Sequence, residues 1–239
     1  MKIEIIKCLQ DNYSYLIIDE IRQTACVVDP SEAKPIINFL KNKKIKLKYI
    51  LNTHHHFDHV GGNLELKKKY NCEVAGFKDD KERIPEIDIF LENNQNWKRD
   101  AFEAKIYHIP GHTTGHIAFH FFKEKKIFTG DTLFSLGCGR IFEGTYEQMF
   151  SSLKKIKNLP KDTEIYCGHE YTLQNSNFCL ANDPENLKLK RKILEINEKL
   201  KNNLPTVPSI LGDELECNIF LKAEDIESFS KLRDSKDNF

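Results

Sequence analysis

Short apolar runs bounded by turn residues are spaced along the first two thirds of the chain. They are rich in Ile, Val, Tyr and Phe, and dipeptides such as Asp29-Pro30 mark turns between them. Runs of this kind predict β-strands. The predicted strands cover residues 3–9, 13–19, 24–29, 46–53, 104–109, 116–122, 126–131 and 163–168.

Helical patterns separate several of these runs. Ser31 is a suitable N-cap for a helix through Leu40, and a second helix begins within residues 61–70. Thr145 and Gln148 have the spacing of a capping box. The helix after this box would bury one apolar face, formed by Met149, Phe150, Leu153 and Ile156.

The pattern changes near residue 173. From Tyr171 onward helical spacing dominates, and Asp183-Pro184 has the residue types of an N-cap and first helical position. One apolar face then repeats at helical spacing, at Leu189, Ile193, Ile196 and Leu200. We therefore expect an α/β body at residues 1–173 and a small helical domain at residues 174–239.

Composition narrows the function classes. The chain has 239 residues, 40% of them apolar, and its formal net charge is zero. A neutral chain has no general attraction to nucleic acid or to anionic membranes, and no apolar run is long enough to span a bilayer. The start of the chain, "MKIEIIKCLQ", lacks the uninterrupted apolar stretch of a signal peptide. Seven scattered cysteines without a CxxC pair predict buried, reduced thiols and a cytoplasmic protein.

The histidines carry the chemical signal. All nine lie between residues 54 and 169, and "THHHFDHVGG" holds four of them with an aspartate. Each candidate ligand follows a predicted strand, and strand ends on one edge of a sheet converge in space. These candidates are His54, His56, Asp58, His59, His112, Asp131 and His169.

Counting the donors predicts two metal sites. One set would be His54, His56 and His112, the other Asp58, His59 and His169, and Asp131 has two oxygens with which to bridge them. Nitrogen and oxygen donors without thiolate suit zinc, iron or manganese, and paired metals with open positions are typical of hydrolytic catalysis. Structural or outer-sphere positions are expected for the other histidines, His55, His108, His116 and His120.

The order of motifs resembles the metallo-β-lactamase superfamily and, within it, the glyoxalase II or hydroxyacylglutathione hydrolase family. The motifs are "DNYSYLI", "THHHFDHVGG", "PGHTTGH", "TGDTLFSLGCGR", "FEGT", "GHEYT" and the C-terminal "RDSKDNF". The resemblance spans nearly the whole chain. It implies an αββα sandwich followed by a helical domain, with the same two ligand sets and with Asp131 as the bridge.

The resemblance also implies a reaction. A glutathione thioester, typically S-D-lactoylglutathione, would be hydrolysed to D-lactate and glutathione by a hydroxide that two metals generate, with zinc the first candidate. Asp131 would be shared by both metals, and Asp58 would also orient the hydroxide. The thiolate leaving group needs no general acid, because thiols have a pKa of about 8.5.

Glutathione carries two carboxylates, which favour cationic partners. The family positions imply Arg140, Tyr171, Arg233 and Lys236 as binders, and Arg233 and Lys236 would project to one side of a helical turn. The chain has Phe142 where many relatives have tyrosine, which removes one hydrogen bond of about 0.5–1.5 kcal/mol.

Four other functions compete with this interpretation. A persulfide dioxygenase of the same superfamily would use one iron, but such enzymes end with a shorter tail. A β-lactamase would often have cysteine in place of Asp131. Nucleic-acid processing lacks a basic, aromatic-rich stripe, and a non-catalytic metal protein would need closed coordination. We expect a monomer with a small-molecule substrate and no nucleic-acid or membrane partner.

Overall fold

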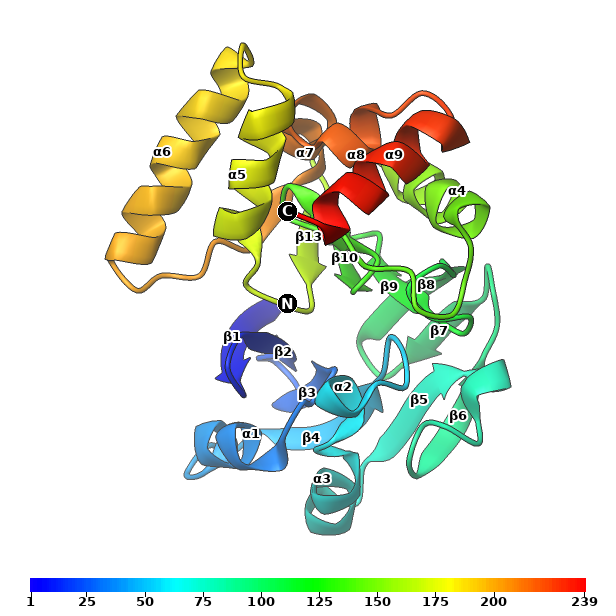
Figure 1. Ribbon diagram of the computed structural model, residues 1–239. Coiled ribbons are helices and arrows are strands. Elements are labelled where there is room, and N and C mark those ends of the chain that lie inside the picture. The colour runs from blue at the N-terminus through cyan, green and yellow to red at the C-terminus, as the bar shows by residue number, and fades with distance from the viewer. The chain divides into compact units, whose positions relative to one another are not determined.

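The computed structural model describes residues 1–239 (Figure 1). The chain divides into two compact units, which are described separately. The first unit comprises Met1–His108 and Gly115–Glu124, and the second comprises Ile109–Thr114 and Lys125–Phe239.

The first unit is built on a six-stranded sheet in the order β1-β2-β3-β4-β5-β6. Its strands are β1 (Lys2–Cys8), β2 (Asn12–Asp19), β3 (Thr24–Val28), β4 (Lys46–Leu51), β5 (Glu73–Phe77) and β6 (Ile87–Leu91). The first three strands pair antiparallel, and β3 to β6 pair parallel. The unit also contains an antiparallel meander of β7 (Asn96–Arg99), β8 (Phe102–His108) and β9 (Ile117–Phe121).

The helices of the first unit cover the apolar face of this sheet. They are α1 (Ala33–Leu40), α2 (Phe57–Val60), α3 (Asn63–Tyr70) and the 3₁₀ turn η1 (Lys78–Asp80). Ile36 and Leu40 of α1 and Leu66 of α3 enter one core cluster with Val27 and Ile50 of the sheet. This packing fixes the ends of β3 and β4, where polar residues follow the buried strands.

The parallel strands bring two loops to one edge. Asp29, just after β3, donates its backbone N–H to Leu51 O at 3.0 Å, and Asn52, just after β4, donates to Ala75 O at 2.8 Å. Carboxyl ends of neighbouring parallel strands share an edge. The loops that follow β3 and β4 therefore lie side by side.

The second unit contains five strands and most of the helices. Strands β10 (Lys126–Gly130) and β13 (Glu164–Cys167) are parallel, β14 (Ser209–Ile210) is antiparallel to β13, and β11 (Leu133–Phe134) forms a hairpin with β12 (Gly137–Cys138). The helices are α4 (Tyr146–Lys157), α5 (Thr172–Asn182), α6 (Leu187–Lys201), α7 (Leu211–Cys217), α8 (Ile219–Lys222) and α9 (Ile226–Asp237).

The apolar pattern predicted most of these elements. All eight predicted strands are present, although β4 ends at Leu51, two residues before the predicted end. The capping box at Thr145 and Gln148 forms, and the predicted apolar face of α4 is buried. Strands β5, β6 and β7 were not predicted, because their apolar runs are short and Trp97 is the only apolar residue of β7.

Two predicted helix starts are wrong. Glu32, not Ser31, is the N-cap of α1, because Ser31 is buried and donates its backbone N–H to Ser14 Oγ at 3.2 Å. Asp183 is the C-cap of α5. The next helix begins later, where the Asn186 side chain accepts the N–H of Leu189.

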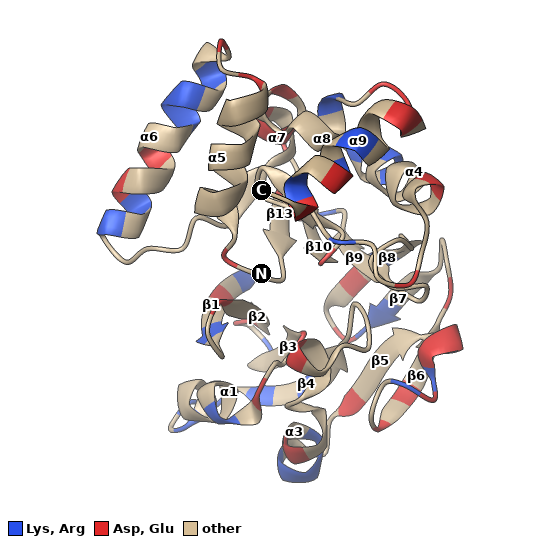
Figure 2. Cartoon of the chain, in the orientation of Figure 1, with Lys and Arg blue, Asp and Glu red and all other residues tan.

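Other bulk predictions can be compared with the structure. All seven cysteines are buried and free of disulfide bonds. None of the helices combines the length and apolar character that crossing a bilayer requires. Basic and acidic residues are interspersed on most elements, as Figure 2 shows.

The α4 capping box gives a stability prediction. Thr145→Ala removes the acceptor for the Gln148 N–H and should cost about 1 kcal/mol. For a chain of this size the melting temperature should fall by about 2–4 °C, measured by circular dichroism. Thr145→Ser keeps the hydroxyl and should restore most of the loss. A serine variant as unstable as the alanine variant would contradict the capping role.

Candidate metal centre

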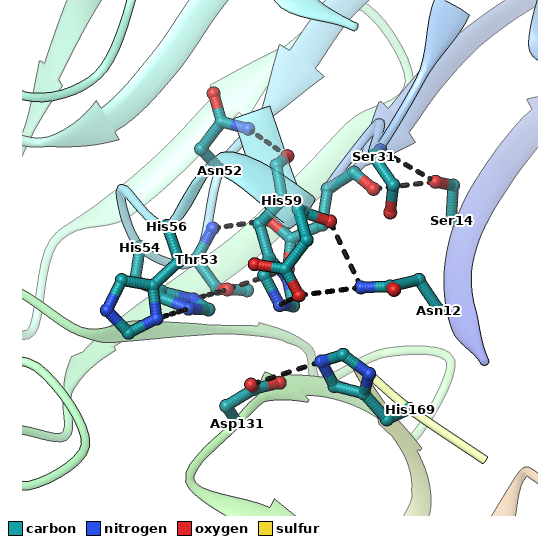
Figure 3. A network of polar contacts seen from close by, with 12 residues as sticks. Asn12, Ser14, Ser31, Asn52, Thr53, His54, His56, His59, Asp131 and His169 are labelled. Carbon is teal, nitrogen blue, oxygen red and sulfur yellow. Dashed lines mark hydrogen bonds and ion pairs between the residues drawn. The ribbon is translucent and has the colours of Figure 1, made fainter. Parts of the chain in front are cut away.

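In the first unit, the loop after β4 and the short helix α2 carry four of the predicted ligands, shown in Figure 3. His54 and His59 are almost completely buried, whereas His56 and Asp58 are partly exposed. His54 Nε2 lies 3.1 Å from His56 Nδ1, and His59 Nε2 lies 3.6 Å from Asp58 Oδ2. The loop therefore gathers its donor atoms at one place.

Asp29 fixes the orientation of two of these histidines. Its carboxylate accepts the Thr53 N–H and the Thr53 hydroxyl, both at 2.7 Å, and His59 Nδ1–H at 3.0 Å. Because the only hydroxyl proton of Thr53 goes to Asp29, Thr53 Oγ1 is an acceptor for His54 Nδ1–H at 3.0 Å. Both imidazoles are therefore protonated on Nδ1, which leaves Nε2 as the ligand atom.

Asn12 holds the aspartate of the loop. Its Nδ2 donates to Asp58 Oδ2 at 2.9 Å and to the Asp58 carbonyl at 3.1 Å. Asn12 is buried at the start of β2. An amide that holds both the backbone and the carboxylate of Asp58 restricts the directions in which that carboxylate can point.

In the second unit, three predicted ligands meet around one carboxylate. Asp131 Oδ2 lies 3.5 Å from His112 Nε2 and 3.3 Å from His169 Nε2, the latter pair drawn in Figure 3. All three residues are at most 6% exposed. The His112 Nδ1–H donates to the Arg140 carbonyl at 2.8 Å, so His112 also presents Nε2.

These separations fit a metal. Two ligands of one tetrahedral zinc ion, each about 2.0–2.1 Å away, lie about 3.4 Å apart. The four donor pairs within the two units are 3.1 to 3.6 Å apart. Buried imidazoles with Nδ1 engaged by a protein acceptor are also the usual arrangement of metal-bound histidines.

The remaining histidines have other contacts. His55 lies 3.4 Å from Asp80, where burial opposes ionisation but hydrogen bonds from His55 and Arg83 outweigh it and lower the pKa of the carboxyl. His116 stacks on His54 with ring centroids 4.6 Å apart, which fits its expected supporting position. His108, at the end of β8, stacks on Phe77 of β5, and burial lowers the pKa of His120 to about 4.

The predicted substrate binders all lie in the second unit. Tyr171 stacks on His169 with centroids 4.7 Å apart. Arg140 is exposed and pairs with Asp237 at 3.2 Å. Lys236 donates to Gln174 O at 3.3 Å.

Arg233 differs from the other cations because it is only 3% exposed. It donates to Cys138 O at 2.7 Å and to Asp237 Oδ1 at 2.9 Å. Asp237 therefore lies between Arg140 and Arg233, and both cations meet one carboxylate oxygen. The structure gives Arg233 protein partners that the sequence did not predict.

Sequence reasoning missed the residues that orient the ligands. Asp29 and Asn12 were assigned only to turns, and Thr53 only to a strand end. A signal was present, because Asp29 follows a fully apolar strand at the same sheet edge as the histidine loop. It becomes readable only once β3 and β4 are known to be neighbours.

Comparison with known proteins identifies the family. Residues 10–93 and 100–169 match the metallo-beta-lactamase superfamily model, and residues 170–239 match the model of the hydroxyacylglutathione hydrolase C-terminus. A hydroxyacylglutathione hydrolase of Pelagibacter ubique is 65% identical over the full length of both chains. The chain belongs to the hydroxyacylglutathione hydrolase family. This confirms the resemblance seen in the sequence.

Other relatives and solved structures agree. A hydroxyacylglutathione hydrolase of Methylococcus capsulatus is 40% identical, with 98% of this chain and 97% of that protein covered. The structure of ETHE1 from Myxococcus xanthus superimposes with a TM-score of 0.76 at 20% identity, covering 98% of this chain and 90% of that one. BLEG-1, a B3 metallo-beta-lactamase, gives 0.72 at 22% identity, with 93% and 100% covered. These two likenesses confirm the predicted fold class.

The role of Asp29 gives a prediction for this family member. Asp29→Asn should raise the dissociation constant for zinc about 10- to 100-fold, because an amide cannot accept both the Thr53 hydroxyl and His59 Nδ1–H in the same way. The constant can be measured by competition with a chelating dye. Asp19→Asn changes a buried aspartate at the end of β2 that pairs with Arg22. It is the matched control and should leave zinc binding unchanged. If Asp29→Asn and Asp19→Asn raised the dissociation constant for zinc equally, Asp29 would not be the residue that orients the histidines.

Proposed function

We propose that this chain hydrolyses the thioester of S-D-lactoylglutathione and related 2-hydroxyacylglutathiones to D-lactate and glutathione, a step in methylglyoxal detoxification. The full-length match to hydroxyacylglutathione hydrolases carries this proposal. The match of residues 170–239 to the C-terminus of that family supports this function over others in the wider superfamily.

We propose two divalent metal ions per chain. His54, His56 and His112 would bind one ion, and Asp58, His59 and His169 the other. Asp131 would bridge them, which its Oδ2 supports by lying within 3.5 Å of both His112 and His169. Zinc is the first candidate for this nitrogen and oxygen set, and iron or manganese are alternatives.

Bound divalent ions at such a site lower the pKa of water and polarise a carbonyl oxygen. The protein residues supply orientation. Asn12 holds the Asp58 carboxylate, which we propose directs the nucleophile, and Asp131 completes the carboxylate set. The leaving thiolate needs no proton donor, because a thiol pKa of about 8.5 makes the thiolate a good leaving group.

The cations at the end of the chain support a carboxylate-bearing substrate. Burial lowers the pKa of Lys236, and Arg233 and Arg140 lower it further, so three positive groups lie close together. Asp237 offsets only one of these charges. We propose that Arg140, Lys236 and Tyr171 contact glutathione. Arg233 would contribute its charge from a buried position.

Phe142 follows Arg140 by two residues in the chain. It is 63% exposed, and its ring contacts His112 with centroids 5.1 Å apart. A phenylalanine here offers a substrate apolar surface and no hydrogen bond. We propose that the carboxylate contacts contribute more to glutathione binding in this chain than in relatives with tyrosine.

We further propose that the protein acts as a monomer in the cytoplasm and has no nucleic-acid or membrane partner. The buried free thiols support a reducing compartment. The even mixture of charges supports a small-molecule substrate over a polyanion.

The shared carboxylate predicts a joint loss of both metals. The purified protein should contain close to two transition-metal ions per chain, and Asp131→Ala should lower both occupancies and abolish thioester hydrolysis. His116→Ala, which removes a ring stacked on His54, should keep both metals. Elemental analysis provides the measurement. One iron per chain with oxygen consumption on glutathione persulfide would instead support a persulfide dioxygenase.

The cation set predicts a substrate-specific defect. Arg140→Ala should raise KM for S-D-lactoylglutathione about three- to tenfold and leave kcat nearly unchanged. The effect is modest because the lost contact is a charge-assisted hydrogen bond that exposure to solvent weakens. Steady-state kinetics with a small thioester lacking the glutathione carboxylates should show no change. Arg191→Ala, an exposed arginine on α6, is the matched control. Equal defects on both substrates would remove the support for glutathione binding at this position.

A further inference from the structure

Side chains from the C-terminal helices hold the backbone of the hairpin that links Asp131 to Arg140. We call residues 132–140 the bridging hairpin; they include β11 and β12. Side chains from α5, α7, α9 and the α7–α8 junction bind its backbone. The contacts are Asn175 Nδ2 to Ser135 O (3.1 Å), Leu136 N to Glu214 Oε2 (2.8 Å), Cys179 Sγ to Leu136 O (3.1 Å), Asn218 Nδ2 to Gly137 O (3.1 Å) and Arg233 Nη1 to Cys138 O (2.7 Å).

The bridging hairpin needs this support. Each of its strands has only two residues, and an isolated hairpin of that length is not stable in water. Leu136 has a φ of +57°, a left-handed conformation that is unfavourable for leucine. External partners on consecutive backbone groups offset that cost.

Glu214 is the most unusual of these partners. It is 1% exposed, and burial raises the pKa of its carboxyl. Its Oε2 accepts the Leu136 N–H and also Asn218 Nδ2 at 3.0 Å. A buried carboxyl group is expensive to retain, and here it serves the turn of the bridging hairpin.

Asn175 packs closely against the turn of the bridging hairpin. A Cβ on Gly137 would lie 2.4 Å from Asn175 Nδ2, so only glycine lets α5 approach the turn this far. The contact leaves no space for the bridging hairpin to shift toward α5.

The other end of the bridging hairpin touches the candidate ligands. Gly139 donates its N–H to Thr132 O at 3.2 Å, and a Cβ on Gly139 would overlap the Asp131 carbonyl. The Arg140 carbonyl accepts His112 Nδ1–H at 2.8 Å. A displacement of the bridging hairpin would therefore move the group that sets the His112 tautomer.

We propose that Glu214 and Asn175 are positioning residues: through the bridging hairpin they hold the Arg140 carbonyl against His112 and the Asp131 backbone in place. The C-terminal helices thus organise the metal ligands as well as the substrate contacts. This inference rests on the proposed function only in taking His112 and Asp131 as ligands. It does not depend on which thioester is hydrolysed.

Three variants test Glu214. Glu214→Ala removes the acceptor of the Leu136 N–H, whereas Glu214→Gln keeps an oxygen in its place. Asn186→Ala removes the N-cap of α6 and the contact of Asn186 with Glu216 O of α7, but it leaves Glu214 and the other side chains that bind the bridging hairpin, and so controls for general destabilisation. Zinc affinity is measured by chelator competition, and the His112 tautomer by side-chain NMR of the metal-free protein.

The alanine variant should bind zinc about tenfold more weakly, the low end for loss of an outer-sphere partner, and lose the His112 Nδ1–H signal. The glutamine variant should restore both. With S-D-lactoylglutathione, kcat should fall for the alanine variant more than KM rises. Asn186→Ala should lower the melting temperature and leave zinc affinity and the His112 signal unchanged.

A second pair covers the case in which Glu214→Ala does not fold. Asn175→Ala removes one contact to the bridging hairpin. Asn182 lies on the same helix and donates to Phe178 O, so Asn182→Ala is the matched control. Unchanged zinc affinity and an intact His112 signal in a folded Glu214→Ala or Asn175→Ala protein would overturn the proposal. If the alanine variants lost zinc affinity as expected but the unmodified protein hydrolysed no glutathione thioester, the proposed function would be refuted and the positioning role would stand.

Discussion

The candidate metal centre depends on which nitrogen of each buried imidazole carries the proton. A metal-binding histidine must present a lone pair, so its other nitrogen needs an acceptor. Asp29 accepts from His59 directly and from His54 through Thr53, and the Arg140 carbonyl accepts from His112. These acceptors lie on segments that the sheets and helices must place correctly. Much of the architecture can be understood as the means of placing them.

The two units supply the acceptors for the imidazole N–H groups in different ways. In the first unit the acceptor is a carboxylate at the end of β3, and the register of parallel strands brings it beside the histidine loop. In the second unit the acceptor is a backbone carbonyl at the end of a short hairpin, which cannot hold its conformation alone. Side chains from the C-terminal helices supply that stability. In this chain the helical region therefore supports the turn that follows the candidate ligand Asp131.

Arg233 occupies a position that the family resemblance assigns to substrate binding, but in this structure its contacts are with the protein itself. Its place in "RDSKDNF" indicates a substrate contact, but its guanidinium is buried between Cys138 O and Asp237. Arg140 and Lys236 remain the more accessible cations. The pairing of Arg140 and Arg233 with one aspartate keeps these charges close together in spite of their mutual repulsion.

The sequence by itself determined the strands with continuous apolar runs, the capping box of α4, the choice of candidate ligand residues and the family, because each depends on local pattern or on motif order. It did not reveal β5 to β7, whose apolar runs are short, or the true starts of α1 and α6, where Ser31 and Asp183 bond elsewhere. Only the tertiary structure decided the roles of Asp29, Asn12 and Glu214. Their partners are between 24 and 78 residues away in the chain, and a contact over that distance leaves no local trace in the sequence.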